Sequence, residues 1–422
     1  MADIEPKITR GLMRSLNTVR NDEQLMPIIV RYSPDHRVMR SGEGVVGVQH
    51  VHSFHLRPFA HMMATPSAIQ RLAENPDVVR IYQDLPVYAL LDASIPKIGV
   101  PRLWDEGLMG EGTRIAIVDT GIDQDHPDFE GRIAATADFT GEGPGDGNGH
   151  GTHCAGIAAG SGKACDGRYR GVAPAATIYA AKVLRANGQG MMSTVMAGVE
   201  WAVDQGVHII SLSLGGPGPG DGSDALSEIC DAAVAEGITV VVAAGNDGPN
   251  GYTIGSPGCA RNVITIGACN DDDRIAHFSS RGPTTDGRVK PDVVLPGVDI
   301  VSARAGGTSM GTVVDEWYTS ASGTSMATPH AAGVCALLLQ AHPGLSPAHM
   351  KARLMETAID LGAVPYAQGR GRVDAWSATH TDVEPPPESP TGPGPIPAPP
   401  QGCLPGALRV LLGLHPPRTE EE

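Results

Sequence analysis

Four short segments of the chain place a side chain that could take part in chemistry beside glycines, at the end of an apolar run or the start of a helical pattern. They are TRIAIVDTGID with Asp119, GNGHGTHCAG with His150, VVVAAGNDG with Asn246 and SGTSMATPHAAG with Ser325. A hydroxyl becomes a nucleophile when a base accepts its proton and a third group orients that base. Asp119, His150 and Ser325 are the residue types that this chemistry requires.

Each of these residues also has a structural interpretation when it is taken alone. An aspartate at a strand end often caps a helix or forms a turn, and a serine at a helix start is a common N-cap. The joint pattern favours chemistry, because Asp119, His150 and Ser325 all lie at strand-to-helix junctions of one predicted parallel sheet. Such junctions converge where open α/β sheets bind ligands.

The elements that must position these residues are short apolar runs that alternate with Ala-rich helices from Val100 to about Ala378. The strand-like runs are TRIAIVD, ATIYAAKVL, GVHIISLSL, GITVVVAAG and NVITIGA, and AAGVCALLLQAH has the length of a helix. Continuous rather than alternating apolar runs indicate strands that are covered on both faces. The predicted fold class is therefore α/β, with a parallel sheet sandwiched by helices over residues 92–380.

The flanking regions have different patterns. Residues 1–24 are predicted to be an N-terminal extension, and residues 25–91 a small α+β domain. The elements expected in that domain are the β-rich runs Pro27–Tyr32 and Val45–Phe59, the helix Pro66–Asn75 and the strand Val78–Tyr82. Residues 381–422 are rich in proline, which favours polyproline II and a semi-rigid linker or tail. A ligand for a proline-recognising module is the alternative.

Composition excludes several classes of function. The 422 residues carry a formal net charge of −16 and only 4% aromatic side chains, so nucleic acid and anionic membranes are not expected partners. The chain has no apolar stretch of membrane-spanning length, and its first 25 residues contain no continuous apolar run. Seven scattered cysteines form no CxxC pair, which fits a reducing compartment. We expect a cytoplasmic location and leave secretion by another route open.

The segments DTGID, GHGTHCAG, SLSLGG, AAGN and GTSMATPH resemble the successive motifs of the subtilisin-like serine proteases, in that family's order of Asp, His and Ser. The similarity runs from about Ile95 to Ala378. It implies a serine endopeptidase in which Ser325 is the nucleophile, His150 the general base and Asp119 the group that orients it. It also implies that Asn246 and the Ser325 backbone N–H bind the oxyanion.

The same resemblance implies which residues bind the substrate. One segment would pair with an extended peptide, and two others would form a wall and the base of the primary specificity pocket. These residues are Ser213, Leu214 and Gly215 for the pairing segment, Ala243, Ala244 and Gly245 for the wall, and Gly255 for the base. Pairing through the main chain predicts broad specificity. The pocket predicts a large apolar or aromatic residue before the scissile bond.

The first domain resembles the inhibitor-type propeptide of the same family. This resemblance implies a self-processed precursor whose own propeptide is an intramolecular inhibitor. Cleavage is expected close to Leu90 or Leu91 in VYALLDAS, because both leucines suit an apolar pocket. An N-terminal domain that does not inhibit is the alternative.

No cofactor is expected for the chemistry, but members of this family commonly bind calcium. Asp128 in DHPDF matches a carboxylate ligand of one calcium site. The loop after the histidine helix, GSGKACDGRYRG, lacks the family's asparagines, and the alternative is that Asp128 only caps or pairs locally.

Other functions remain as alternatives or are disfavoured by the motifs. The loop GEGPGDGNGHG lacks the Lys-Ser/Thr ending of a phosphate-binding loop, and the His150–His153 spacing lacks the glutamate of zinc proteases. One rival is a catalytically silent binding or scaffold protein on the protease fold. A second rival is an esterase or peptide ligase that uses the same acyl-enzyme.

Overall fold

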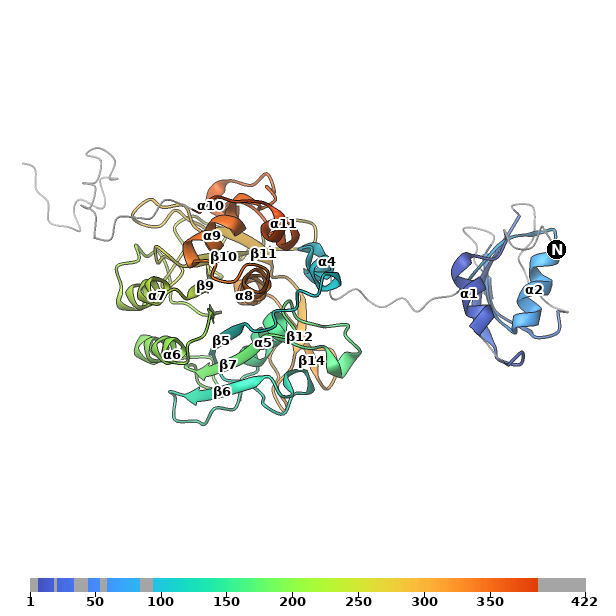
Figure 1. The fold of residues 1–422 in the computed structure, drawn as a ribbon, viewed down its shortest axis with the longest axis horizontal. Coiled ribbons are helices and arrows are strands. Elements are labelled where there is room, and N and C mark those ends of the chain that lie inside the picture. The colour runs from blue at the N-terminus through green and yellow to red at the C-terminus, as the bar shows by residue number, and fades with distance from the viewer. Residues whose placement is uncertain (1–6, 19–20, 34–44, 54–58, 84–93, 386–422) are drawn as a thin grey trace, which may run out of the picture. The chain divides into compact units, whose positions relative to one another are not determined.

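The computed structural model describes residues 7–18, 21–33, 45–53, 59–83 and 94–385. The chain divides into two compact units, Met1–Leu90 and Leu91–Glu422, called here the smaller and the larger unit (Figure 1). The expected processing residues Leu90 and Leu91 lie outside the described residues, as does most of the proline-rich tail, residues 386–422.

The smaller unit contains a four-stranded antiparallel sheet in the order β2–β3–β1–β4. The strands are β1 Met26–Tyr32, β2 Val48–Ser53, β3 Phe59–Ala64 and β4 Val78–Gln83, and the helices are α1 Arg10–Thr18 and α2 Pro66–Glu74. Alternate residues of β1 and β3 are buried in one core with residues of both helices. On the other side of the strands, Ile29 and Tyr82 are cross-strand partners, and Phe59 lies against the Tyr82 ring.

Two features of the smaller unit differ from the sequence prediction. The run expected at Val45–Phe59 contributes β2, and a further strand, β3, follows it and returns antiparallel, with Val48 opposite Ala64. Residues 1–24, expected as an extension, contribute α1, whose Leu12 is fully buried in the core. Leu12 is buried by strands that follow it in the chain, and no pattern local to residues 1–24 contains that information.

The larger unit is built on a seven-stranded sheet in the order β11–β10–β9–β8–β5–β7–β6, in which all neighbouring strands are parallel. The strands are β5 Arg114–Asp119, β6 Ile133–Asp138, β7 Thr177–Lys182, β8 Ile209–Leu212, β9 Thr239–Ala243, β10 Ile264–Cys269 and β11 Val293–Pro296. The five apolar runs form β5, β7, β8, β9 and β10, so the predicted parallel sheet is confirmed. Strands β6 and β11, which lie at the two edges of the sheet, were not predicted.

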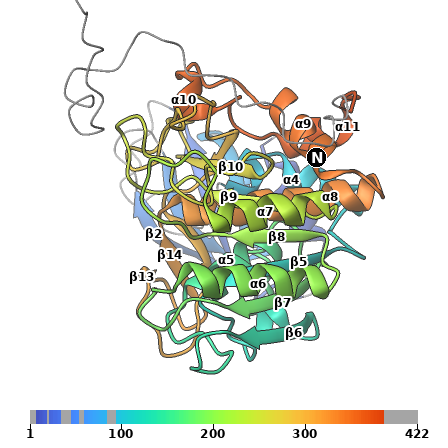
Figure 2. The same ribbon diagram turned by 90° about the vertical axis from the view of Figure 1, so that its left-hand side faces the viewer.

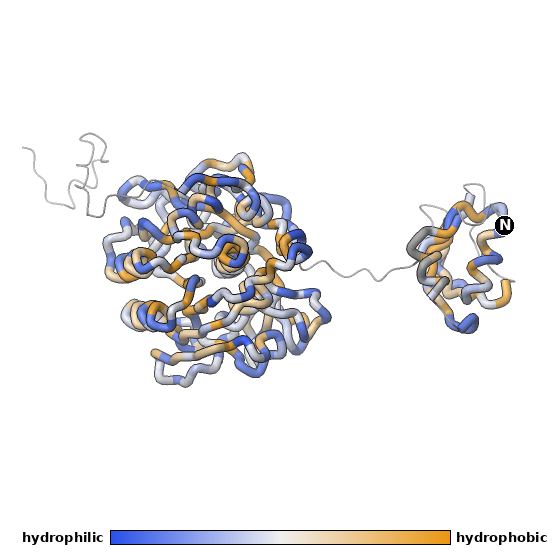
Figure 3. The backbone as a smooth tube through the Cα atoms, in the orientation of Figure 1, coloured by the Kyte–Doolittle hydropathy of each residue, from blue (hydrophilic) through white to orange (hydrophobic). Residues whose placement is uncertain are grey.

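Helices cover both faces of this sheet, as predicted. Helices α5 His150–Ala159 and α8 Thr324–Ala341 cover one face, and α6 Met192–Asp204 and α7 Ala225–Ala235 lie side by side on the other (Figure 2). Alternate side chains of β5 enter the two cores, with Ile115 and Ile117 on the α5–α8 side and Ala116 and Val118 on the α6–α7 side. Apolar segments run through the sheet and α8, and polar segments follow the surface loops (Figure 3).

The strand order creates a crevice at the carboxyl end of β5. From β5 the chain reaches the far edge strand β6, returns through β7 on one side of β5, and then crosses to β8 on the other side. This reversal is a topological switch point, where open α/β sheets bind ligands. Asp119 is the last residue of β5, and Ser213 follows the end of β8.

The remaining elements of the larger unit are short. A three-stranded antiparallel sheet has the order β12–β14–β13. Its strands are β12 Ile300–Ala303, β13 Thr312–Val313 and β14 Tyr318–Ala321, and the other helices are α3 Ser94–Lys97, α4 Val100–Asp105, η1 Pro127–Phe129, η2 Lys163–Cys165, α9 Pro347–Glu356, α10 Pro365–Gln368 and α11 Ala375–His380. Among the described helices, none combines the length and the apolar character that a membrane span requires.

Candidate active site

Asp119 ends β5 at the switch point and is completely buried. Its Oδ1 accepts a hydrogen bond from the backbone N–H of Thr120 at 2.7 Å and lies 2.7 Å from Nδ1 of His150. This contact fixes Nδ1 as the ring nitrogen of His150 that binds Asp119. It leaves Nε2 of His150 as the ring atom available to a nucleophile.

His150 begins α5, and its side chain is 22% exposed. Burial disfavours the charged imidazolium, but the charge of the Asp119 carboxylate and its hydrogen bond to the ring, with a smaller contribution from Cys154, together raise the pKa of His150 well above its ordinary value. A base with a raised pKa takes up a proton more readily.

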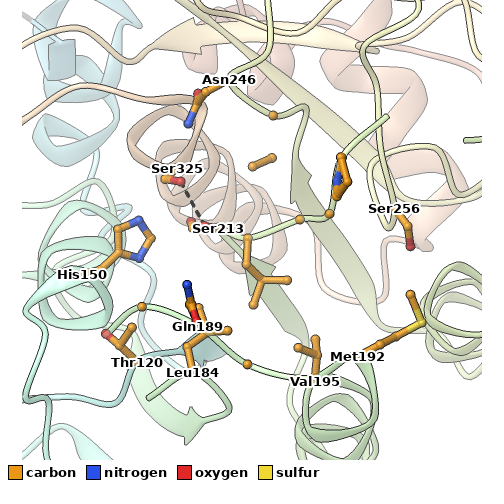
Figure 4. Close-up of a pocket in the computed structure, with 18 of the residues that line it drawn as sticks. Thr120, His150, Leu184, Gln189, Met192, Val195, Ser213, Asn246, Ser256 and Ser325 are labelled. Atoms are coloured by element: carbon orange, nitrogen blue, oxygen red, sulfur yellow. Dashed lines mark hydrogen bonds between the residues drawn. The ribbon is translucent and has the colours of Figure 1, made fainter. Parts of the chain in front are cut away.

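Ser325 lies in the first turn of α8, directly after Thr324. The backbone N–H groups of a first helical turn have no partner within the helix, and the helix dipole adds positive potential there. The Ser325 hydroxyl donates a hydrogen bond to the carbonyl of Ser213 at 3.0 Å, and it lies between His150 and Asn246 (Figure 4). The Ser325 hydroxyl, the His150 imidazole and the Asn246 amide therefore line the same cleft at the start of α8.

Asn246 follows β9, and its amide is held in one orientation. Its Oδ1 accepts hydrogen bonds from the backbone N–H of Thr324 at 2.9 Å and from the Thr324 hydroxyl at 3.0 Å. The amide nitrogen consequently points toward Ser325 (Figure 4). Sequence reasoning did not identify Thr324 as the residue that orients this amide.

A cleft of about 860 Å³ contains His150, Asn246 and Ser325. Five of the seven residues expected to bind substrate also line it, namely Ser213, Leu214, Gly215, Ala243 and Gly245. The opposite wall comes from residues that no motif had indicated, and these include Leu184, Gln189, Met192 and Val195 (Figure 4). No local signal marks them, because Leu184 and Gln189 lie in the segment between β7 and α6, Met192 and Val195 lie in α6, and all four meet the cleft only through tertiary packing.

Ala244 and Gly255 lie behind the cleft and are not among its lining residues. Ala244 packs with Ile254 and Cys259 in a small buried cluster. A Cβ atom at Gly255 would collide with the carbonyl oxygen of Gly216. The expectation that Gly255 forms the base of the pocket is therefore corrected: its missing side chain admits the main chain of Gly216, and Ser256 lines the cleft instead.

Cys154 lies one helical turn after His150, with its Sγ 3.9 Å from Nδ1 of His150. Of the His, Cys, Asp and Glu side chains in the described residues, Asp119, His150 and Cys154 form the group of three close enough to share a metal ion. Burial raises the pKa of the Cys154 thiol, so it is protonated at neutral pH. The hydrogen bond between Asp119 and His150 already accounts for this cluster.

The residues around Asp128 do not fit a calcium ion, which requires six to eight oxygen ligands. The Asp128 carboxylate is buried and accepts hydrogen bonds from the Tyr318 hydroxyl at 2.9 Å and the Ala164 backbone N–H at 3.1 Å. Its backbone carbonyl accepts from the Ser161 N–H and the Arg132 guanidinium. Protein donors thus occupy both carboxylate oxygens, which agrees with the alternative of local pairing.

Comparisons with known proteins relate the chain to one family. The family model described as the subtilase family matches residues 110–375. Serine protease AprX of Bacillus subtilis (strain 168) is 41% identical over 340 residues, covering 74% of this chain and 76% of that protein. Subtilisin E of the same organism is 38% identical over 317 residues, which cover 74% of this chain and 78% of that protein.

A solved structure agrees with these sequence matches. It is the crystal structure of a cold adapted subtilisin-like serine proteinase, which is similar to this chain with a TM-score of 0.52 and 33% sequence identity. The match covers 63% of this chain and 88% of that one. The expected fold class, a helix-covered parallel sheet of the subtilisin type, is confirmed.

Proposed function

The chain belongs to the subtilase family and is a subtilisin-like serine endopeptidase, and on this premise we propose that Asp119, His150 and Ser325 are its catalytic triad. The observation that carries this proposal is the 2.7 Å contact between Nδ1 of His150 and Oδ1 of Asp119, at the cleft that contains Ser325. No cofactor takes part in the proposed reaction.

In the first half of the reaction, the Ser325 hydroxyl turns from the Ser213 carbonyl to Nε2 of His150. His150 accepts the proton as Oγ attacks the peptide carbonyl, and a tetrahedral oxyanion forms. Asp119 stabilises the resulting imidazolium. The imidazolium then donates its proton to the leaving amine, the C–N bond breaks, and Ser325 carries the acyl group.

In the second half, water replaces the amine. His150 removes a proton from the water, which attacks the acyl carbonyl, and the bond to Ser325 Oγ breaks as Oγ regains a proton. Both oxyanions would be bound by the amide of Asn246 and the backbone N–H of Ser325. The orientation that Thr324 imposes on Asn246 supports this role, because a donor fixed before the reaction needs no reorganisation during it.

The substrate would bind as an extended strand beside Ser213, Leu214 and Gly215, through main-chain hydrogen bonds that make few demands on sequence. Ala243 and Gly245 would form one wall of the pocket for the residue before the scissile bond. The small side chains of this wall support a preference for large apolar or aromatic residues. Cleavage of a peptide library tests this, and a dominant preference for arginine or aspartate at that position would contradict it.

The smaller unit is proposed to act as the chain's own propeptide and inhibitor. Helices cover one face of its antiparallel sheet, and the other carries partly exposed apolar side chains such as Ile29 and Tyr82, which is suitable for binding another protein surface. We place the processing site close to Leu90 or Leu91, between the smaller unit, Met1–Leu90, and the protease domain of residues 92–380.

Intact mass of the purified precursor tests the triad and the processing site together. Wild type is expected to split near residues 88–92, and Ser325→Ala is expected to remain whole. Wild-type protein that stays intact and also fails to degrade casein would favour the silent scaffold. An active protein that splits elsewhere would contradict only the processing site.

The esterase or ligase alternative differs in which nucleophile accepts the acyl group. Competition between water and an added amine for the acyl-enzyme separates the two reactions. Hydrolysis that dominates at millimolar amine supports the endopeptidase, and near-complete transfer to the amine would favour the ligase.

A reducing compartment is proposed as the working location. The six cysteines within the described residues are all unpaired, and five of them are buried. Fractionation of the producing cells, followed by detection of the chain, tests this location.

A further inference from the structure

Asp146, in the loop that precedes the histidine helix, has an unusual number of hydrogen-bond donors for one carboxylate. It is only 8% exposed. Its Oδ1 accepts from the Thr120 hydroxyl at 2.8 Å, the Asn148 N–H at 3.1 Å and the Gly149 N–H at 2.7 Å. Its Oδ2 accepts from the backbone N–H of Thr152 at 2.9 Å and from the Thr152 hydroxyl at 2.7 Å.

Four of the five donors, all except the Asn148 N–H, belong to residues at the end of β5 or at the start of α5, the two elements that carry Asp119 and His150. Thr120 follows Asp119 at the end of β5, whereas Gly149 and Thr152 flank His150 at the start of α5. Gly149 occupies the N-cap position and supplies no side chain to the free N–H groups of this helix. The Asp146 carboxylate supplies that acceptor from the preceding loop.

The hydroxyls of Thr120 and Thr152 continue this hydrogen-bond network to further backbone N–H groups. Each threonine hydroxyl has a single proton, and Asp146 accepts it from both Thr120 and Thr152. Their lone pairs then accept other N–H groups: Thr120 Oγ1 accepts from Gly151 at 2.8 Å, and Thr152 Oγ1 accepts from Asp123 at 2.9 Å. Only an acceptor with no proton of its own satisfies all five donors, so an amide at position 146 would turn an NH₂ group toward some of them.

We propose that Asp146 is a positioning residue that holds the end of β5 and the start of α5 in the register that aligns Asp119 with His150. This inference rests on the proposed triad. Asp146 makes none of its hydrogen bonds to the triad side chains themselves and acts through Thr120 and the first turn of α5. Its loss would displace the imidazole relative to Ser325 while the substrate-binding segment after β8 keeps its place.

The variant Asp146→Asn tests the proposal, because it removes the charge and keeps the shape. Displacements of about 1 Å at a catalytic group cost up to about 100-fold in rate, so kcat is expected to fall by about 10- to 100-fold. KM is expected to change by less than about twofold, because the cleft walls are retained. Asp374→Asn is the matched control, since Asp374 also caps a helix, α11, by accepting the N–H of Ser377.

A fluorophosphonate probe separates misalignment from partial unfolding. The end point of labelling counts folded sites, and the rate of labelling reports how well Ser325 is activated. Asp146→Asn is expected to reach the wild-type end point at a lower rate. If it does not fold, Thr152→Val provides the test, because it loses two of the network's hydrogen bonds, and Thr152→Ser, which retains them, is expected to recover the rate.

The outcomes distinguish this inference from the proposed function. Wild-type protein that takes up no probe would refute the triad itself. Wild type that is labelled, together with an Asp146→Asn variant whose labelling rate and kcat match those of Asp374→Asn, would overturn only the positioning role. A fall in the end point with an unchanged rate would assign Asp146 to stability alone and would also overturn it.

Discussion

In the proposed triad, His150 is the residue whose protonation state decides whether Ser325 can react. Burial disfavours its charged form, but the Asp119 carboxylate 2.7 Å away raises the pKa of His150 well above the ordinary value of 6.5. Protonated imidazole cannot accept the serine proton, so activity is lost as the pH falls through this raised pKa. The acid limb of kcat/KM, measured on a neutral peptide, is therefore expected to have its midpoint above pH 6.5.

The variant Asp119→Asn provides the comparison for this pH dependence. Without the carboxylate the pKa of His150 is expected to fall, and the acid limb of the residual activity moves to lower pH. A wild-type midpoint at or below about pH 6 would contradict the electrostatic role of Asp119.

Asn246 contributes through one amide group whose orientation Thr324 fixes. Asn246→Ala removes the proposed side-chain donor to the oxyanion and leaves the triad in place. The expected loss of kcat is roughly 100- to 1,000-fold, the range known for a subtilisin that lost its oxyanion asparagine. Asn262→Ala, outside the cleft, is the control. A loss of less than about fivefold in steady-state kcat would remove Asn246 from the oxyanion site.

At the scale of elements, the two helices that carry His150 and Ser325 each bury a histidine that has no part in the proposed triad. Burial lowers the pKa of His153 in α5 to about 3 and that of His330 in α8 to about 4. The unfolded chain binds protons at these positions near pH 6.5, whereas the folded chain does not. Stability is therefore fully present above pH 6.5 and declines as the pH falls toward 4, by up to about 1.4 kcal/mol per pH unit for each histidine.

Urea unfolding of the Ser325→Ala protein at pH 7.5, 5.5 and 4.5 measures this decline without self-digestion. The same measurement on a Ser325→Ala, His330→Gln protein shows how much of the decline comes from His330. The rest comes from other groups that titrate in acid, such as the carboxylates. A smaller decline in the double variant is expected. Equal declines in the two proteins would contradict the buried neutral His330.

The loop that follows α5 is held to η1 by hydrogen bonds to Asp128 rather than by a metal ion. Tyr318→Phe leaves one oxygen of the buried Asp128 carboxylate without its hydroxyl donor, which is expected to lower the free energy of unfolding by about 1–3 kcal/mol. Tyr366→Phe, at a side chain 39% exposed, is the control. A calcium chelator is expected to shift the melting temperatures of wild type and Asp128→Asn by the same amount, and a marked fall in wild type alone would contradict local pairing of Asp128.

The sequence predicted those elements whose signal is local. Five strands of the seven-stranded sheet are continuous apolar runs, and glycine-flanked motifs mark Asp119, His150, Asn246 and Ser325. Strand β6 was missed because its burial is incomplete along its length. The roles of Asp146 and Thr324 and the wall around Met192 were missed as well, because each depends on contacts between segments far apart in the chain.

At the scale of the whole molecule, a single chain contains a serine endopeptidase of the subtilase family and a smaller unit that we propose to inhibit it. The sheet order places the carboxyl ends of β5, β8 and β9 at one crevice, and two helices begin there. The proposed triad is therefore a consequence of topology as much as of residue type. The precursor can process itself only if Asp119, His150 and Ser325 are already active before the chain is cleaved.

The most direct test of the central claim is covalent labelling with a fluorophosphonate probe, followed by peptide mass mapping. Wild type is expected to carry one adduct, on Ser325, while Ser325→Ala carries none and His150→Ala reacts at least about 100-fold more slowly. An adduct on another residue, or casein digestion that persists in Ser325→Ala, would contradict the assignment of Ser325 as the nucleophile.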